Sequence, residues 1–142
     1  MVHQHFANKD TYAFSSTNDA YGGGGLAATA RDLAVFYQLL FSNKVFKKPE
    51  TLKLFLEKAP LPDGYVYKNL KNGRNSLTNQ NTDYRFGFKV IDIFGTEAYT
   101  HGGILGSRVI YVPEHDVAVA MNCTNKSAEF ILKRVVLRAI EN

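Results

Sequence analysis

The spacing of apolar residues changes from a helical period to a strand period in the middle of the chain, and this change constrains the fold more than any other feature of the sequence. Before residue 58, apolar residues recur at intervals of three and four, which is the period of an amphipathic helix. A helix over about residues 30–42 is predicted from Leu33, Phe36, Tyr37 and Leu40. From Tyr84 to about residue 122, apolar residues alternate with polar ones, as they do in a strand. The sequence therefore predicts helices followed by a sheet.

Local signals mark the ends of three predicted helices. Thr29 followed by Asp32 forms a capping-box pattern at the start of the first helix. Pro49, a favoured first-turn residue, starts a second helix that is predicted to end near Lys58. A last helix over about residues 126–141 is predicted from an apolar face. Its basic residues lie near its C-terminal end, where they interact favourably with the negative end of the helix dipole. That face consists of Ala128, Leu132, Val135, Val136, Ala139 and Ile140.

Four strands are predicted in the second half of the chain. They cover about residues 84–93, 97–100, 107–112 and 117–122, and the last two flank the turn Pro-Glu-His-Asp as a hairpin. Short strands in sequence order favour an antiparallel sheet, so the predicted class is α+β, an antiparallel β-sheet flanked by helices. Residues 1–21 are predicted to be a polar lead-in to a domain over residues 22–142, and residues 65–83 a surface excursion.

Composition argues against several kinds of partner. The net charge of +4 is modest and its basic residues are scattered, so the sequence does not predict nucleic-acid binding. A single cysteine, Cys123, excludes an internal disulfide and lies in an apolar run that predicts a buried thiol. No apolar run is long enough to span a membrane, and no signal peptide is visible. His3 and His5 are interpreted as polar surface, so no metal and no cofactor are predicted.

Two glycine-rich segments are candidates for a ligand site. After residues 22–25, a phosphate loop requires Gly-Lys-Ser/Thr, and Leu26 and Ala27 follow instead, so a flexible turn is the interpretation. The segment Thr-His-Gly-Gly over residues 100–103 ends a predicted strand, and its glycines allow a ligand close to the backbone. These residues by themselves leave both a turn and a site open.

Four motifs, taken together and in order, carry a resemblance to a known family. Tyr-Gly-Gly-Gly-Gly-Leu-Ala-Ala-Thr-Ala-Arg-Asp is similar to the Gly-Gly segment that opens a helix in serine hydrolases of the β-lactamase-like family, and Pro-Glu-Thr-Leu to the family's next helix start. Tyr-Arg-Phe-Gly-Phe resembles a Tyr-Gly-x-Gly-Trp strand, with Arg85 and Phe88 as departures. His-Gly-Gly-Ile-Leu-Gly-Ser and the hairpin after it resemble the family's His-Gly-Gly segment. The resemblance covers about residues 20–142.

The resemblance implies chemistry for these residues. Members attack an ester or amide carbonyl with the serine of a Ser-x-x-Lys motif, assisted by Tyr-x-Asn and by a third motif, Lys-Thr-Gly or His-x-Gly, on an edge strand of the site. His101, Gly102 and Gly103 match the third motif and are implied to bind substrate. His101 is implied to orient or polarise it, and the N–H of Ile104 to donate to the oxyanion.

Two departures decide what the chain alone is expected to do. No serine has lysine three residues later, so the nucleophile motif is absent. Tyr67-Lys68-Asn69 spells Tyr-x-Asn but follows the glycine segment instead of preceding it, and is interpreted as chance in a polar loop. We therefore expect an incomplete β-lactamase/transpeptidase-like domain, the C-terminal part of a serine hydrolase, inactive alone.

Expected partners follow from the same resemblance. They are the N-terminal part of the same hydrolase, a small-molecule acyl substrate (lactam, peptide or ester) and, for the isolated chain, further copies of itself through an uncovered sheet edge or helix face. The family implies the bacterial periplasm or cell envelope. The alternatives are a non-catalytic ligand-binding or interaction module that reuses the half-fold, and an unrelated helix-and-sheet domain. The sequence does not define the substrate.

Overall fold

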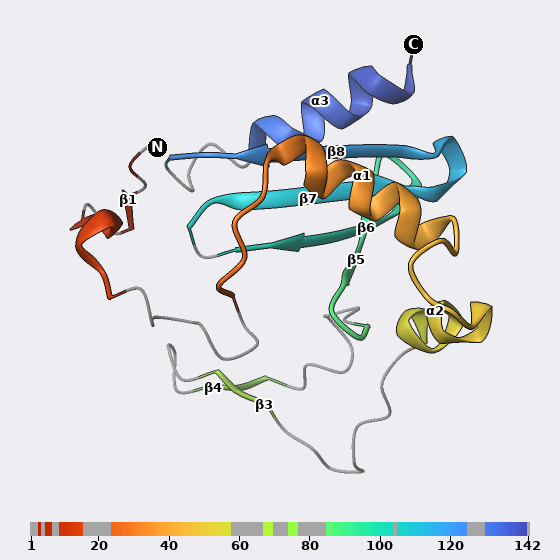
Figure 1. Ribbon diagram of the computed structural model, residues 1–142, viewed down its shortest axis with the longest axis horizontal. Helices are drawn as coiled ribbons and strands as arrows, with labels where there is room; N and C mark the ends of the chain where they lie inside the picture. The colour runs from red at the N-terminus through yellow and green to blue at the C-terminus, as the bar shows by residue number, and fades with distance from the viewer. Residues whose placement is uncertain are drawn as a thin grey trace.

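A four-stranded antiparallel sheet forms the centre of the computed structural model, which describes residues 3, 5–6, 9–15, 24–57, 67–69, 74–76, 85–103, 105–124 and 130–141 (Figure 1). Its strand order is β5-β6-β7-β8, so each strand pairs with its neighbours in sequence. The strands are β5 (Lys89–Ile93), β6 (Thr96–Gly102), β7 (Ser107–Val112) and β8 (Val117–Asn122). With three helices, this confirms the predicted α+β class.

Tight turns connect the strands. The predicted β7–β8 hairpin is confirmed with its predicted bounds, and the 3-10 turn η3 (Pro113–His115) joins its strands. Asp116 follows in the left-handed region, with φ of 50°, and its carboxylate accepts a hydrogen bond from the Tyr111 hydroxyl at 3.0 Å. The β5–β6 turn places Phe94 and Gly95 at φ of 54° and 87°. Positive φ at both central residues matches the right-handed twist of a hairpin.

The strand predicted from residue 84 begins later, at Lys89. Gly87 has φ of +85°, and the Arg85 N–H donates to the Phe88 carbonyl at 2.7 Å, so the chain turns before it enters the sheet. The alternation of Phe86 and Phe88 suggested a strand because it has the same period. Tyr84 lies outside the described residues. β6 is longer than predicted at both ends.

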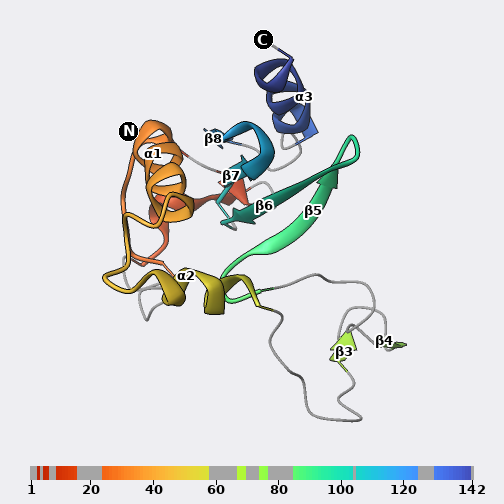
Figure 2. The same ribbon diagram turned by 90° about the vertical axis from the view of Figure 1, so that its right-hand side faces the viewer.

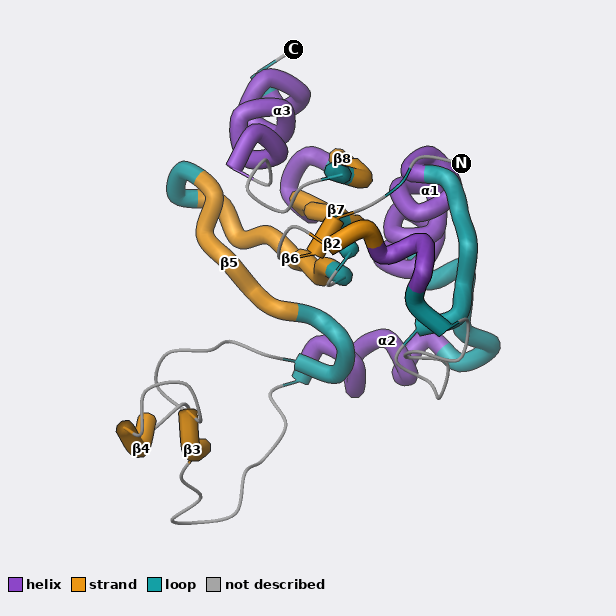
Figure 3. Tube along the Cα trace, turned by 90° about the vertical axis from the view of Figure 1, so that its left-hand side faces the viewer, coloured by secondary structure: helices purple, strands orange, loops and turns teal. Residues whose placement is uncertain are grey.

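The two longer helices, α1 (Ala30–Phe41) and α3 (Phe130–Ile140), lie on opposite faces of the sheet (Figure 2). The shorter α2 (Pro49–Leu56) packs on the α1 side, where the Phe86 N–H donates to the Phe55 carbonyl at 3.2 Å (Figure 3). The capping box of α1 is confirmed. Thr29 Oγ1 accepts from the Asp32 N–H at 3.1 Å, and Asp32 Oδ2 accepts from the Thr29 N–H at 3.0 Å. Lys58 and residues 125–129 lie outside the described part.

Both faces of the sheet are covered by apolar side chains, because alternate strand residues point to opposite faces. The face toward α1 and α2 holds one buried cluster, formed by Tyr37, Leu40, Leu52, Phe88, Val109 and Tyr111. The face toward α3 holds a second, formed by Ile93, Ala98, Ile110, Val112, Leu132 and Val136. Cys123 is buried, as predicted.

Some apolar helix positions that were predicted to face the core are exposed. Phe36 and Val135 are each 45% exposed, and Ala139 is also exposed. The apolar stripe of each helix is wider than the strip that the sheet contacts, so its margin remains uncovered. Within the described residues, no helix is long and apolar enough to cross a membrane.

The described part of the lead-in is more ordered than the predicted loop. It contains the short pair β1 (His5–Phe6) and β2 (Lys9–Asp10), followed by the 3-10 turn η1 (Thr11–Ala13). The His5 N–H donates to the Thr124 carbonyl at 3.1 Å, which ties the lead-in to the chain just after β8. A further small hairpin pairs β3 (Tyr67–Asn69) with β4 (Arg74–Ser76), so the Tyr-x-Asn sequence lies on a strand and not in a loop.

Candidate functional site

The C-terminal end of β6 extends beyond the first residue of its antiparallel neighbour β5. The pairing of these two strands ends at Lys89 and Thr100, whereas β6 continues to pair with β7 through His101–Val109 and Gly102–Arg108. β6 is therefore an inner strand over most of its length and an edge only at its last two residues. The expectation of an edge strand is therefore wrong for most of β6, because β5 pairs along it. The last two residues of β6 lie beyond β5 because β5 begins only at Lys89, after the turn at Gly87.

The open edge at this point carries backbone groups. The Gly103 N–H donates to the Ser107 carbonyl at 2.7 Å, on the β7 side. Successive N–H groups along a strand point to opposite edges, so the N–H of Gly102 points to the other side, where β5 has ended. A main-chain donor at an open edge can bind the oxygen of a ligand.

Two side chains approach the glycines of the His-Gly-Gly segment closely, so that an added Cβ at either position would require one of these side chains to shift. A Cβ on Gly102 would lie 2.9 Å from Cζ of the Arg108 guanidinium, and a Cβ on Gly103 would lie 2.6 Å from the Ser107 hydroxyl. His101 is exposed on the opposite face of the strand from the Arg108 side chain, since alternate residues change face. The segment therefore presents an exposed imidazole and a bare stretch of backbone.

A cavity of about 360 Å³ lies against this strand end. The β6–β7 side is formed by His101, Gly102, Gly103, Ser107 and Val109, and the opposite side by Gly24, Leu26, Leu33 and Tyr37. The segment that leads into α1 and the first turns of that helix thus form the second wall. The His-Gly-Gly strand end is beside a cavity and is not buried in a remote turn.

Tyr37 is the one titratable residue that α1 contributes to this cavity. Burial raises the pKa of its hydroxyl above the usual value, so Tyr37 stays protonated at neutral pH. A phenol that keeps its proton can donate a hydrogen bond but cannot act as a general base. Tyr37 can therefore act in this cavity as a hydrogen-bond donor, opposite the His101 imidazole.

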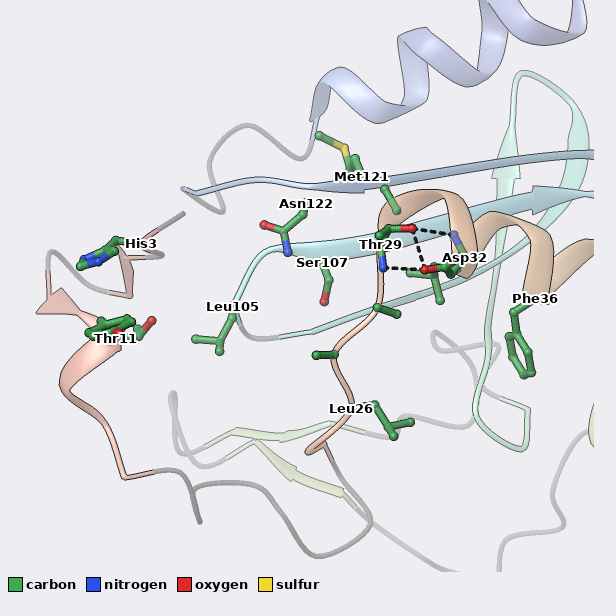
Figure 4. A pocket seen from close by; sticks show the side chains of 15 residues that line it. His3, Thr11, Leu26, Thr29, Asp32, Phe36, Leu105, Ser107, Met121 and Asn122 are labelled. Atoms are coloured by element: carbon green, nitrogen blue, oxygen red, sulfur yellow. Dashed lines mark hydrogen bonds between the residues drawn. The ribbon is translucent and has the colours of Figure 1, made fainter. Parts of the chain in front are cut away.

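A second, larger cavity of about 920 Å³ adjoins the first (Figure 4). The two share Leu26, Leu33 and Ser107. Its far wall is the lead-in, where His3 Nδ1 and Asp10 Oδ2 are 2.6 Å apart and the His3 ring stacks on Tyr12 with centroids separated by 4.5 Å. Hydrogen bonds from the Tyr12 amide and from His3 hold the pKa of Asp10 below its usual range.

Three of the four predicted site residues come together at one cavity, namely His101, Gly102 and Gly103. Ile104, the predicted oxyanion donor, lies outside the described residues. Tyr37 and Ser107 were not predicted as site residues. Ser107 could have been considered because it follows Gly103 by only four residues, whereas nothing in the sequence near Tyr37 connects it with the His-Gly-Gly segment. No group of three His, Cys, Asp or Glu side chains that could hold a metal occurs among the residues described.

The architecture is that of an α+β domain with a cavity at the end of a strand. The model of the Beta-lactamase family matches residues 2–139, nearly the whole chain, and the chain belongs to this family. Comparison with curated proteins and with solved structures finds no match. The family match confirms the resemblance recognised from the four motifs and extends it into the lead-in.

Proposed function

We propose that this chain supplies the His-Gly-Gly wall of a serine hydrolase site of the β-lactamase, DD-peptidase or esterase type, and that it is inactive alone. The observation that carries the proposal is the overhang of β6 at a cavity, which exposes His101 and the Gly102 backbone to a ligand. Family membership supports the reaction class, serine-dependent acyl transfer to water. The substrate is a small acyl compound.

In this proposal, the carbonyl of the substrate lies against the open edge of β6. By its position in the His-Gly-Gly motif, the N–H of Ile104 donates to the oxyanion of the tetrahedral intermediate. The imidazole of His101 orients the substrate or polarises its leaving group. Tyr37 adds a protonated hydroxyl on the opposite wall. Each of these groups stabilises charge or holds the substrate, and none attacks the carbonyl.

The attack requires a nucleophile from outside the chain, because no serine here is followed by lysine at the third position. We propose that the N-terminal part of the same hydrolase brings the Ser-x-x-Lys and Tyr-x-Asn motifs to the open side of the cavity. The partly exposed apolar margin of α3, including Ile131 and Val135, and the free edge of β5 are surfaces for that part. In its absence, the same surfaces favour association with further copies of the chain.

Labelling with a fluorescent penicillin and a fluorescent phosphonate tests this proposal. The isolated chain is expected to form no covalent adduct, and a protein in which a Ser-x-x-Lys segment precedes this chain is expected to form one. In that longer protein, His101→Ala should slow acylation about 100-fold, the lower end of the range for a positioned side chain that assists a leaving group. His115→Ala is the matched control, because His115 is also exposed but lies in η3.

Two results would contradict the proposal. One is an adduct on the isolated chain, and the other is equal acylation rates for His101→Ala and His115→Ala. The alternative function, a non-catalytic binding module, predicts that ligands shift the NMR signals of Gly102 and Gly103 while the longer protein never becomes labelled. The same experiments therefore separate the two functions.

A further inference from the structure

The cavity of about 920 Å³ is built from segments that are distant in sequence (Figure 4). One end is formed by the lead-in and the other by the start of α1, including Phe36. Between them, Leu105 from the β6–β7 turn and Met121 from the end of β8 also line the cavity. In Figure 4, His3 and Thr11 lie at the opposite end of the cavity from Phe36. Its volume is within the range of about 300–1,000 Å³ that is typical of small-molecule sites.

Large apolar side chains in this cavity are left open to solvent. Leu26 is 97% exposed, Phe36 45% and Leu105 39%. Burying such surface under an apolar ligand group is favourable in proportion to the area that is removed from water. The walls therefore suit a bulky hydrocarbon or aromatic group.

The charge at the start of α1 argues against an anionic ligand. Helix N-termini usually attract anions, but the capping box uses the Thr29 and Asp32 groups for each other. Hydrogen bonds from the Thr29 hydroxyl and amide hold the pKa of Asp32 below its usual range, so a carboxylate occupies this end of the cavity. A negatively charged ligand would be repelled there, and a neutral one would not.

Ser107 lies where the two cavities meet. Its hydroxyl sits over the backbone of Gly103, and among the described residues it has no hydrogen-bond partner. A hydroxyl in this position can donate to a polar group of a ligand that passes from one cavity into the other. The junction is therefore polar at one point and apolar beyond it.

We infer that the substrate of the proposed site is a neutral ester or amide with a bulky apolar arm, which fills the larger cavity while the carbonyl lies against the His-Gly-Gly strand end. This inference rests on the proposed function and adds the class of substrate to it. Ser107 holds the substrate at the junction, and Leu26, Phe36 and Leu105 contact the arm.

Two neutral amides that differ only in one arm, N-methylacetamide and N-octylacetamide, test the inference by binding to the 142-residue chain. NMR signals of Leu105 and Met121 report on the larger cavity, and those of Gly102 and Gly103 on the smaller one. We expect the octyl compound to shift both sets and the methyl compound to shift only the glycines. About twofold tighter binding for each half-buried methylene predicts a difference of about 100-fold over the seven methylenes.

A pair of variants controls for nonspecific binding. Leu26→Asp should weaken the binding of N-octylacetamide at least about tenfold, since it places a second carboxylate in the apolar cavity. Leu54→Asp is the matched control, because Leu54 is 57% exposed on α2 and lines neither cavity. Both leucines are exposed, so neither change removes a core residue.

The possible outcomes separate this inference from the function on which it rests. If only Gly102 and Gly103 respond to the octyl compound, or if both variants bind it equally, the apolar-arm inference is overturned and the proposed function stands. If Leu105 and Met121 respond without the glycines, the larger cavity binds apart from the site, and the inference is again overturned. If none of the four responds, the proposed function loses its support as well.

Discussion

Replacing Gly106 with alanine tests the turn that joins β6 to β7 beside the site. Gly106 has φ of +92°, and a Cβ there would lie 2.1 Å from the Cys123 carbonyl oxygen, far inside contact distance. An alanine in the left-handed region costs about 1–2 kcal/mol. The clash must also displace the segment after β8, where the Cys123 N–H donates to the Gly106 carbonyl at 3.0 Å, a bond worth about 1 kcal/mol. Since the two effects act together, we expect Gly106→Ala to lower the free energy of unfolding by about 3 kcal/mol.

The β5–β6 turn provides a matched control. Gly95 has φ of +87°, but a Cβ there would meet nothing within 4 Å, so Gly95→Ala should cost only the backbone strain of about 1–2 kcal/mol. Urea unfolding followed by circular dichroism measures both variants against the unsubstituted chain. If the two alanine variants are equally stable, contact with Cys123 does not shape the turn, and the reasoning is refuted.

Two further predictions concern the start of α1 and the lead-in. Thr29→Ala removes the acceptor for the Asp32 N–H and should lower the free energy of unfolding by about 1 kcal/mol, seen as a lower urea midpoint with an unchanged slope; an unshifted midpoint would contradict it. The pKa of Asp10 is lower in the folded chain than in the unfolded one. Its carboxylate therefore stabilises the folded lead-in at pH values above the unfolded pKa of about 4, and this stabilisation is lost as the pH falls through the folded pKa. At pH values below about 4, the Tyr12 amide should therefore be less protected from hydrogen exchange than at neutral pH. In Asp10→Asn this protection should not depend on pH. The same independence of pH in the unsubstituted chain would disprove the argument.

Elements with short-range signals were predictable from the sequence. The start of α1 followed from Thr29 and Asp32, and the β7–β8 hairpin from alternation on either side of residues 113–116. The start of β5 was not predictable from alternation, because Phe86 and Phe88 keep the period of a strand while Gly87 turns the chain. Periodicity reports where side chains recur but not whether the backbone between them is extended.

The candidate site was predicted only on one side. His101, Gly102 and Gly103 are adjacent in sequence, so a motif could locate them. The opposite wall, with Leu33 and Tyr37, comes from α1, about 65 residues away in the chain, and is brought there by packing on the sheet. The overhang of β6 likewise depends on where β5 begins, which is a property of the paired strands and not of either one.

The sheet is a simple meander, in which every strand neighbours the next one along the chain. Its contacts close short loops, and such topologies fold faster than those that must first join distant segments. The strand end beside the smaller cavity can consequently assemble from successive hairpins. For the proposed hydrolase, this means that the groups expected to stabilise the transition state are positioned by local strand pairing.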